Sequence, residues 1–406
     1  MKGKSLIPTC IFPPYLPPSD PNITTDNSNN ETKTKKKRKK TMPPTILVAG
    51  ATGNTGRSVV STLSKLLFQT TPNNNNNNPL ITKTHRILAL TRTPQSPTAQ
   101  QLASLPGVEI VEKSWPEITP EWLRSQHVVR AFIASHNQTN QFVEESAFHV
   151  ACLAAGVEHV VRISTMDANV RPDCLAYYPR SHWAVEALLA SHEFSSSSSS
   201  SSSSEGRDGK GKGMGWTSLR ANVFSTFLLA GVVGFIQEFR AAAAAAATVG
   251  GTETEKGEKK KKKLRLLASR DAGVGVVHPD DVGAFAAHLL CQRDIAAHSG
   301  AKYVINGPED IAGREIVRLV EGYIGVELDE EEDVAYEDLS FLDEMNAQLL
   351  LGGRESANVL DSIRYAAEAA FDGRSSRVAS PTSPEVLEIA PPRVTPAQTL
   401  REMLGE

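Results

Sequence analysis

The sequence has few cysteines and no long apolar run. Its four cysteines lie far apart and include no Cys-x-x-Cys pair (Cys10, Cys152, Cys174 and Cys291). That spacing argues against a disulfide framework or a zinc site and indicates reduced thiols inside a cell. The least charged stretch, Ala221–Gln237, is shorter than the roughly 20 apolar residues of a membrane span. No apolar stretch near the start resembles a signal peptide, so we expect a cytoplasmic protein.

Neither sign of charge dominates, since 43 Lys and Arg face 46 Asp and Glu, for a net charge of -3. Such a balance gives no overall electrostatic reason to bind nucleic acid or an anionic membrane. The ten histidines include no His-x-x-x-His pair, and neither a nucleophile elbow nor a Walker loop is present. We therefore expect no metal, no nucleic-acid partner and no membrane association.

Low-complexity sequence takes up much of the 406 residues. Residues 1–44 are rich in Pro, Asn, Thr and Lys and are predicted to be a disordered basic tail, because they offer little apolar area to bury. The Lys/Arg cluster 35–40 within it is typical of a nuclear-import signal, and a solvated flexible arm is the commoner explanation. Stretches near 72–79, 195–215 and 241–263 are predicted to be loop insertions, since the entropy of closing a loop grows only slowly with its length.

The remaining sequence alternates apolar strands with helices. Strands are expected at 45–49, 86–91, 108–111, 128–134, 158–163, 216–220, near 264–268 and 302–305, and helices at 55–68, 97–104, 141–155, 178–190, 224–240, 280–291 and 312–324. This alternation predicts an α/β fold, a Rossmann-type doubly wound parallel sheet over 45–325 with a small C-terminal substrate-binding portion. Residues 326–371 are expected to form a helical extension, and 372–406 a mostly disordered Pro-rich tail with a short helix near its end.

A glycine-rich turn follows the first predicted strand. Gly50 would let the chain leave the strand through unusual backbone angles, Gly53 would let it approach a pyrophosphate, and Gly56 would allow close packing of helix on strand. The amides at the start of the next helix would then point at phosphates. The turn therefore predicts a dinucleotide site formed by Gly50, Thr52, Gly53, Asn54, Thr55, Gly56 and Arg57.

The second strand ends in a cation where a protein that prefers NAD carries Asp or Glu. Arg92 and Thr93 can form charge-assisted hydrogen bonds to a ribose 2′-phosphate, which favours NADP(H), and Arg57 can reinforce them. Ser135 and Ser164 follow later strands and are expected near the cofactor, because ligands of such sheets lie beyond the carboxyl ends of the strands.

Three side chains with acid–base chemistry share one helix face. Tyr178, His182 and Glu186 are spaced at i, i+4 and i+8. Tyr178 could donate a proton or polarise a carbonyl, His182 could hold the cofactor ribose, and Glu186 could fix the imidazole tautomer. The alternative is an ordinary hydrogen-bonded helix surface with no part in catalysis.

These motifs resemble the NmrA-like family of atypical short-chain dehydrogenases over residues 45–325. The similarity is carried by the glycine turn and by Leu90-Thr91-Arg92, Ala154-Ala155-Gly156-Val157, His182-Trp183-Ala184-Val185-Glu186, Leu219-Arg220-Ala221-Asn222 and Val277-His278-Pro279-Asp280-Asp281. It implies NADP(H) binding, with the turn on the cofactor phosphates and Arg92 on the 2′-phosphate. The Tyr-x-x-x-Lys of ordinary short-chain dehydrogenases becomes Tyr178 to His182 here, so a weaker, titratable cation replaces the lysine.

That family contains reductases of quinones, enones and related carbonyls, and also members that bind NADP and regulate other proteins. We accordingly predict an NADPH-dependent oxidoreductase that transfers hydride to an aromatic or conjugated carbonyl substrate. Phe224, Phe227, Leu228 and Phe235 would form the apolar wall of its pocket. The first alternative is a catalytically silent NADP(H) sensor with a regulatory protein partner, and the second is a scaffold with a vestigial nucleotide site.

Overall fold

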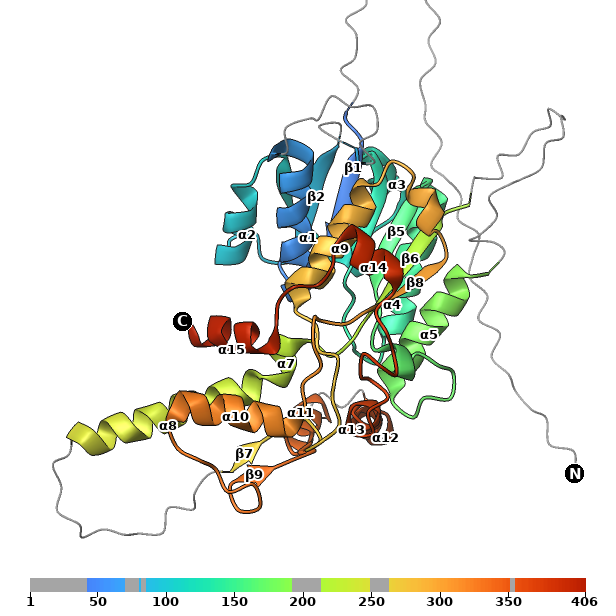
Figure 1. Ribbon diagram of the computed structural model, residues 1–406. Coiled ribbons are helices and arrows are strands. Elements are labelled where there is room, and N and C mark those ends of the chain that lie inside the picture. The colour runs from blue at the N-terminus through green and yellow to red at the C-terminus, as the bar shows by residue number, and fades with distance from the viewer. Residues whose placement is uncertain (1–41, 70–79, 82–84, 192–212, 249–262, 351–354) are drawn as a thin grey trace, which may run out of the picture. The chain divides into compact units, whose positions relative to one another are not determined.

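Seven parallel strands form the central sheet of this computed structural model, in the order β3-β2-β1-β4-β5-β6-β8 (Figure 1). Their bounds are β1 Thr45–Ala49, β2 Arg86–Thr91, β3 Val108–Glu112, β4 Val128–Ile133, β5 His159–Ile163, β6 Gly215–Ala221 and β8 Ala301–Ile305. The strand order reverses between β1 and β4, which is the place where doubly wound sheets bind ligands. The sheet is therefore the predicted α/β Rossmann-type sheet.

The structure describes residues 42–69, 80–81, 85–191, 213–248, 263–350 and 355–406, all within the compact unit Met42–Glu406. The basic cluster 35–40 and the insertion expected near 72–79 lie outside these ranges. Within the described ranges, no helix combines the length and the apolar character needed to cross a membrane. No group of three described His, Cys, Asp or Glu side chains is arranged to hold a metal ion.

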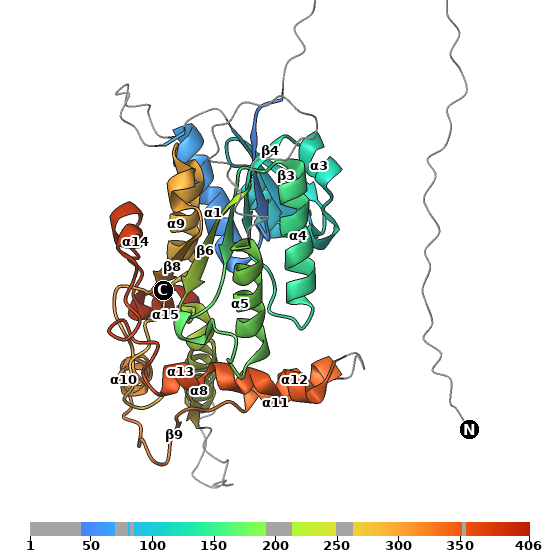
Figure 2. The same cartoon turned by 90° about the vertical axis from the view of Figure 1, so that its right-hand side faces the viewer.

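Helices cover both faces of the sheet (Figure 2). One face packs against α1 Asn54–Ser64, which continues as a π-helical turn over Lys65–Gln69, and against α2 Pro97–Ala103 and α9 Pro279–Cys291. The other packs against α3 Pro120–Ser125, α4 Gln141–Ala155 and α5 Tyr177–Leu189. Alternate residues of β1 point to opposite faces, so Ile46 belongs to the first core and Leu47 to the second.

A second layer lies beyond the carboxyl ends of the strands, at the lower side of Figure 1. It consists of α7 Ser225–Leu228, α8 Ala230–Thr248, α10 Gly313–Ile324, α11 Phe341–Leu350, α12 Ala357–Asp361, α13 Glu368–Phe371 and α15 Pro396–Leu404, with a small parallel sheet of β7 Leu264–Arg265 and β9 Val334–Ala335. Helix α14 Pro384–Ile389 packs beside α9 and β8, and 3₁₀ turns span Trp115–Glu117, Asp167–Asn169, Ile295–His298 and Ser362–Ala366. The strand expected near 264–268 is thus β7, outside the main sheet.

The alanine run expected to be part of a loop insertion is helical instead. Helix α8 continues through Ala241–Ala247 to Thr248, and Ala241–Ala245 are exposed. Alanine has the highest intrinsic helix propensity, so the run can extend a helix whose earlier turns are held by core contacts.

The tail 372–406, expected to be mostly disordered, is ordered and packed. Asn306, at the end of β8, donates a side-chain hydrogen bond to Ser380 O at 2.8 Å, and Ser383 N donates to Val304 O at 3.0 Å. Val386 of α14 and Leu400 of α15 are fully buried. The prediction of disorder from the prolines was wrong. The tail is held by polar contacts along the edge of β8 and by two short helices that each begin at a proline.

Candidate functional site

The turn from β1 to α1 depends on the glycines that the sequence singled out. Gly50 has a φ of 81°, a conformation that side chains disfavour. A Cβ on Gly56 would lie 2.0 Å from the carbonyl oxygen of Gly50, so the helix could not pack this closely with any other residue there. Gly53 is exposed and precedes the first helical residue, Asn54. The turn therefore leaves the start of α1 open to a ligand.

The start of α1 is electropositive. Its first amides have no acceptor within the helix, and its first turn carries no acidic residue. Arg57 is about half exposed and lies 4.0 Å from Asp280 of α9. Arg92 and Thr93 are exposed at the end of β2, and no described residue forms a hydrogen bond or an ion pair with the Arg92 side chain. These groups fit an anionic ligand and leave the Arg92 guanidinium available to one.

A cavity of about 790 Å³ lies between the carboxyl ends of the strands and the second layer. Its polar side includes Asn54, Thr55, Ser135, Asn137, Ser164, Thr165, Tyr178, His182 and Asn222. Its apolar side includes Phe224, Phe227, Leu228, Leu267, Phe341, Leu342, Ile363 and Met403. None of the described residues that line it is Asp, Glu, Lys or Arg.

Aromatic side chains from both halves of the chain meet at this cavity. The rings of Phe227 and Phe341 have centroids 6.0 Å apart at an interplanar angle of 71°, and both rings are partly exposed. Phe235, predicted as part of the same wall, packs instead against the core formed by α8, α10 and their neighbours. The apolar side is thus built by α7 together with the C-terminal segment.

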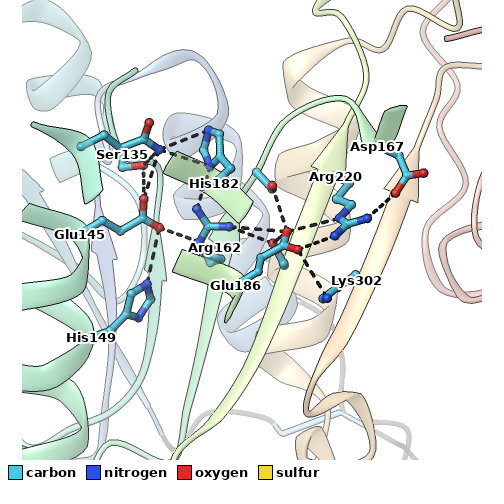
Figure 3. A network of polar contacts seen from close by, with 12 residues as sticks. Ser135, Glu145, His149, Arg162, Asp167, His182, Glu186, Arg220 and Lys302 are labelled. Carbon is cyan, nitrogen blue, oxygen red and sulfur yellow. Dashed lines mark hydrogen bonds and ion pairs between the residues drawn. The ribbon is translucent and has the colours of Figure 1, made fainter. Parts of the chain in front are cut away.

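The three predicted residues of α5 divide between the cavity and the space behind it. Tyr178 and His182 line the cavity, with ring centroids 6.3 Å apart. Glu186 is buried, and none of the hydrogen bonds formed by the His182 ring goes to it. The guanidinium of Arg162 lies between them (Figure 3). The expected direct contact between Glu186 and the imidazole is therefore absent.

Arg162 is the centre of a buried network of charges (Figure 3). Its Nε donates to Glu145 Oε1 at 2.6 Å, its Nη1 donates to Ser218 Oγ at 3.0 Å, and its Nη2 lies 2.7 Å from His182 Nδ1. The side chains of Arg162 and Glu145 are fully buried. Such a pair needs mutual charge compensation, because either charge alone would be costly to bury.

The network continues along the sheet to Glu186. The Glu186 carboxylate accepts hydrogen bonds from Arg220 Nη2 at 2.5 Å and from Ser218 Oγ at 2.7 Å. Lys302 Nζ lies 3.7 Å from Glu186 Oε2. Arg220 also donates to Asp167. Burial alone would raise the pKa of the Glu186 carboxyl, but hydrogen bonds from Arg220 and the charge of Arg162 hold it below its ordinary value.

The two ionisable groups among the described residues of the cavity wall, Tyr178 and His182, are both neutral at physiological pH. Burial, aided by the charge of Arg162, lowers the pKa of His182 to about 3. Burial raises the pKa of Tyr178 to about 12. His182 is therefore not the titratable cation expected from the sequence, because it has lost its water and faces a guanidinium. Tyr178 keeps its hydroxyl hydrogen and can act as a donor.

Two serines on the cavity wall are oriented by the buried carboxylates. Ser135 Oγ donates to Glu145 Oε2 at 2.7 Å, and Ser164 Oγ donates to Glu186 Oε1 at 3.1 Å. A hydroxyl has a single hydrogen, so both oxygens can only accept a hydrogen bond from a ligand in this arrangement. The predicted residues Ser135 and Ser164 thus line the cavity as hydrogen-bond acceptors.

Sequence reasoning missed Glu145 and Arg162, although each leaves a signal. Arg162 lies between Val161 and Ile163 in the strand His159–Ile163, and a charged residue in a central strand must have a buried partner. Glu145 lies one helical turn after Gln141 and one turn before His149 and points to the buried face of α4. The spacing places Glu145 on the core side, but it cannot say which strand residue it meets.

No family model matches the chain, and no curated protein matches it in sequence. An NADPH-dependent quinone oxidoreductase from Escherichia coli, complexed with NADPH, superposes with a TM-score of 0.52 at 19% identity over 88% of this chain and 99% of that one. A mutant NmrA gives 0.54 at 11% identity, covering 90% and 96%. The chain has the fold of NmrA.

A third solved structure with this fold is the Citrobacter sp. triphenylmethane reductase complexed with NADP(H). Its TM-score is 0.55 at 17% identity, over 89% of this chain and all of that one. At these identities the likeness establishes the fold, which agrees with the resemblance found in the sequence motifs. The activity has to be argued from the residues of this chain.

Proposed function

We propose that the protein binds NADP(H) and is an NADPH-dependent oxidoreductase that reduces a quinone, an enone or a related carbonyl compound. The proposal rests on one observation, which is that the open start of α1 and the large cavity lie next to each other. The open start of α1 adjoins a large cavity through Asn54 and Thr55, which belong to both. A phosphate site next to an uncharged, largely apolar cavity is what a dinucleotide with an organic substrate requires.

The binding of NADP(H) is inferred from the charge and geometry of the turn and of the end of β2. The amides of α1 beyond Gly53 would hold the pyrophosphate, and Arg92 with Thr93 would hold the 2′-phosphate. Gly50 and Gly56 shape this turn, in which Thr52 also lies, and Arg57 adds a second cation near it. Two proteins of the same fold were determined with NADPH or NADP(H), which supports this assignment.

The class of substrate that we propose is inferred from the residues of the cavity wall. A charged substrate would lose its water there without meeting an opposite charge, so the wall favours a neutral molecule. Phe224, Phe227 and Phe341 offer aromatic surface to a flat conjugated ring. Bound NADPH supplies the hydride. Tyr178, which stays protonated, would donate a hydrogen bond or a proton to the carbonyl oxygen, and His182 would donate to a hydroxyl or carbonyl oxygen beside it.

A calorimetric titration with NADPH, NADP⁺, NADH and NAD⁺ tests the cofactor assignment. We expect the phosphorylated forms to bind at least about tenfold more tightly, and Arg92→Ala to remove most of this preference, because a charge-assisted hydrogen bond contributes about 1.5–3 kcal/mol. Arg124→Ala is the matched control, since Arg124 is also exposed but pairs with Glu121 on α3. Equal affinity for NADPH and NADH in the unchanged protein would contradict the assignment.

The second candidate, a silent NADP(H) sensor that regulates a protein partner, is favoured by one observation. Neither ionisable group on the cavity wall titrates near neutral pH, because the pKa of Tyr178 is raised and that of His182 is lowered. A turnover screen with quinones, enones and aromatic aldehydes separates the two. For an enzyme we expect NADPH oxidation whose kcat falls about 10-fold to 100-fold in Tyr178→Phe, with little change in NADPH affinity. Tight NADPH binding without turnover of any compound would favour the sensor.

A further inference from the structure

His182 is in contact with a side chain that can only donate hydrogen bonds. Arg162 Nη2 lies 2.7 Å from His182 Nδ1, and a guanidinium has no acceptor and stays charged. Nδ1 must therefore carry no hydrogen. In a neutral imidazole the hydrogen is then on Nε2, which lies 3.2 Å from Asn137 Oδ1, an acceptor. The two partners require the same tautomer.

The other groups around the ring are consistent with this tautomer. Gln141 Nε2 lies 3.2 Å from both ring nitrogens and favours neither. The charged groups that face the ring are Arg162 from β5, Glu145 from α4 and Glu186 from α5 itself. Burial and the guanidinium lower the pKa of His182 against the opposite effect of the two carboxylates. The ring is thus neutral, and its single hydrogen is on the nitrogen next to Asn137.

We propose that Arg162 is a positioning residue that fixes His182 in the Nε2–H tautomer, so that the ring offers one permanent N–H donor to a ligand oxygen in the cavity. His182 and Asn137 both line the cavity, so such an oxygen would compete with Asn137 Oδ1 for this hydrogen. The ion pair with Glu145 (Figure 3) and the hydrogen bond to Ser218 hold the guanidinium in place. The effect on ligand binding rests on the proposed function, whereas the tautomer does not.

With this tautomer, the polar groups on the cavity wall form a complementary set of donors and acceptors. Ser135 and Ser164 accept, because their hydrogens go to Glu145 and Glu186, whereas His182 donates. A neutral donor also suits this wall, whose described residues include no Asp, Glu, Lys or Arg, since it can recognise a hydroxyl or carbonyl oxygen without attracting an anion. The buried charges behind the wall thus fix which atoms donate and which accept.

Long-range ¹⁵N–¹H NMR of the full-length protein with ¹⁵N-histidine tests the tautomer directly. The signals of His182 are identified by their absence in His182→Gln. We expect a pyridine-type shift for Nδ1 and a pyrrole-type shift for Nε2, unchanged between about pH 5.5 and 8. A hydrogen on Nδ1, or an imidazolium in this range, would overturn the proposal whatever the variants show.

Three variants test whether Arg162 is the cause. Arg162→Lys keeps a cation that can only donate, so we expect the same tautomer and an NADPH affinity within about twofold of the unchanged protein. Arg162→Met removes the guanidinium and leaves His182 with the two carboxylates, so the ring should protonate near neutral pH and its Nδ1 signal should change from a pyridine-type to a pyrrole-type shift. Arg220→Met is the control, because Arg220 contacts Glu186 but not His182. The tautomer of His182 should not change in this variant.

The outcomes separate this proposal from the proposed function. If Arg220→Met changes the tautomer as Arg162→Met does, the whole network and not Arg162 fixes it, and the proposal fails. If Arg162→Met does not fold, the spectra of the unchanged protein and of Arg162→Lys still show whether His182 has the proposed tautomer and whether a second cation that can only donate preserves it. If His182 shows the expected tautomer but the unchanged protein binds no nucleotide, the tautomer assignment is supported and the proposed function is overturned.

Discussion

Replacing Gly56 by alanine is expected to abolish measurable NADPH binding. The added Cβ would lie 2.0 Å from Gly50 O and 2.8 Å from Gly50 C, which are backbone atoms that cannot rotate away. The start of α1 must then move off the turn, and the amides proposed to hold the pyrophosphate move with it. We expect affinity to fall at least about 100-fold, equivalent to about 2.7 kcal/mol, in the same calorimetric titration. Overpacking should also lower the free energy of unfolding by about 1–3 kcal/mol.

Gly322→Ala is the matched control for this variant. Gly322 lies within α10, and an added Cβ there meets no heavy atom within 4 Å. Alanine is favoured over glycine inside a helix, so this substitution should raise stability by about 0.5–1 kcal/mol and leave NADPH affinity unchanged. Normal NADPH binding by a folded Gly56→Ala protein would show that the nucleotide does not lie on this turn.

The sequence predicted the sheet and its glycine turn because both depend on local signals. The alternation of apolar strands and amphipathic helices gave every strand of the main sheet, with bounds within one or two residues, and helix 141–155 matches α4. Gly50 and Gly56 could be recognised because backbone angles and close packing admit no other residue. Tyr178 and His182 reach the cavity because helical spacing fixes which residues share a face.

The network behind the cavity could not be predicted, because it depends on pairing between distant segments. Glu145, Arg162 and Glu186 come from two helices and a strand whose register only the folded chain sets. The same holds for the C-terminal segment, where Ile363 and Met403 complete a cavity begun by residues near position 54. The charge of His182 was predicted wrongly for this reason, because the guanidinium that faces it is not near it in the sequence.

Replacing Glu145 by glutamine should cost a large share of the protein's stability. Glutamine keeps the shape but removes the charge that compensates Arg162, which would then face Glu186 alone at 3.8 Å. Breaking a buried ion pair in this way typically costs about 3–5 kcal/mol. We expect urea unfolding at pH 7.5 to show a loss of this size. Glu144→Gln is the control, because its partly exposed pair with His136 should be worth about 1 kcal/mol or less.

The loss in Glu145→Gln should depend on pH in a defined direction. Burial alone would raise the pKa of the Glu145 carboxyl, but Arg162 and the neighbouring His149 hold it well below its ordinary value of 4.5. A folded-state pKa that is lowered gives stability that is present above the unfolded pKa and is lost as the pH falls through the folded one. The difference in unfolding free energy between the two proteins should therefore be constant from about pH 6 to 8 and should shrink below about pH 4.5. A difference that stays the same in acid would mean that glutamine disturbs packing alone, and that Glu145 does not compensate a buried charge.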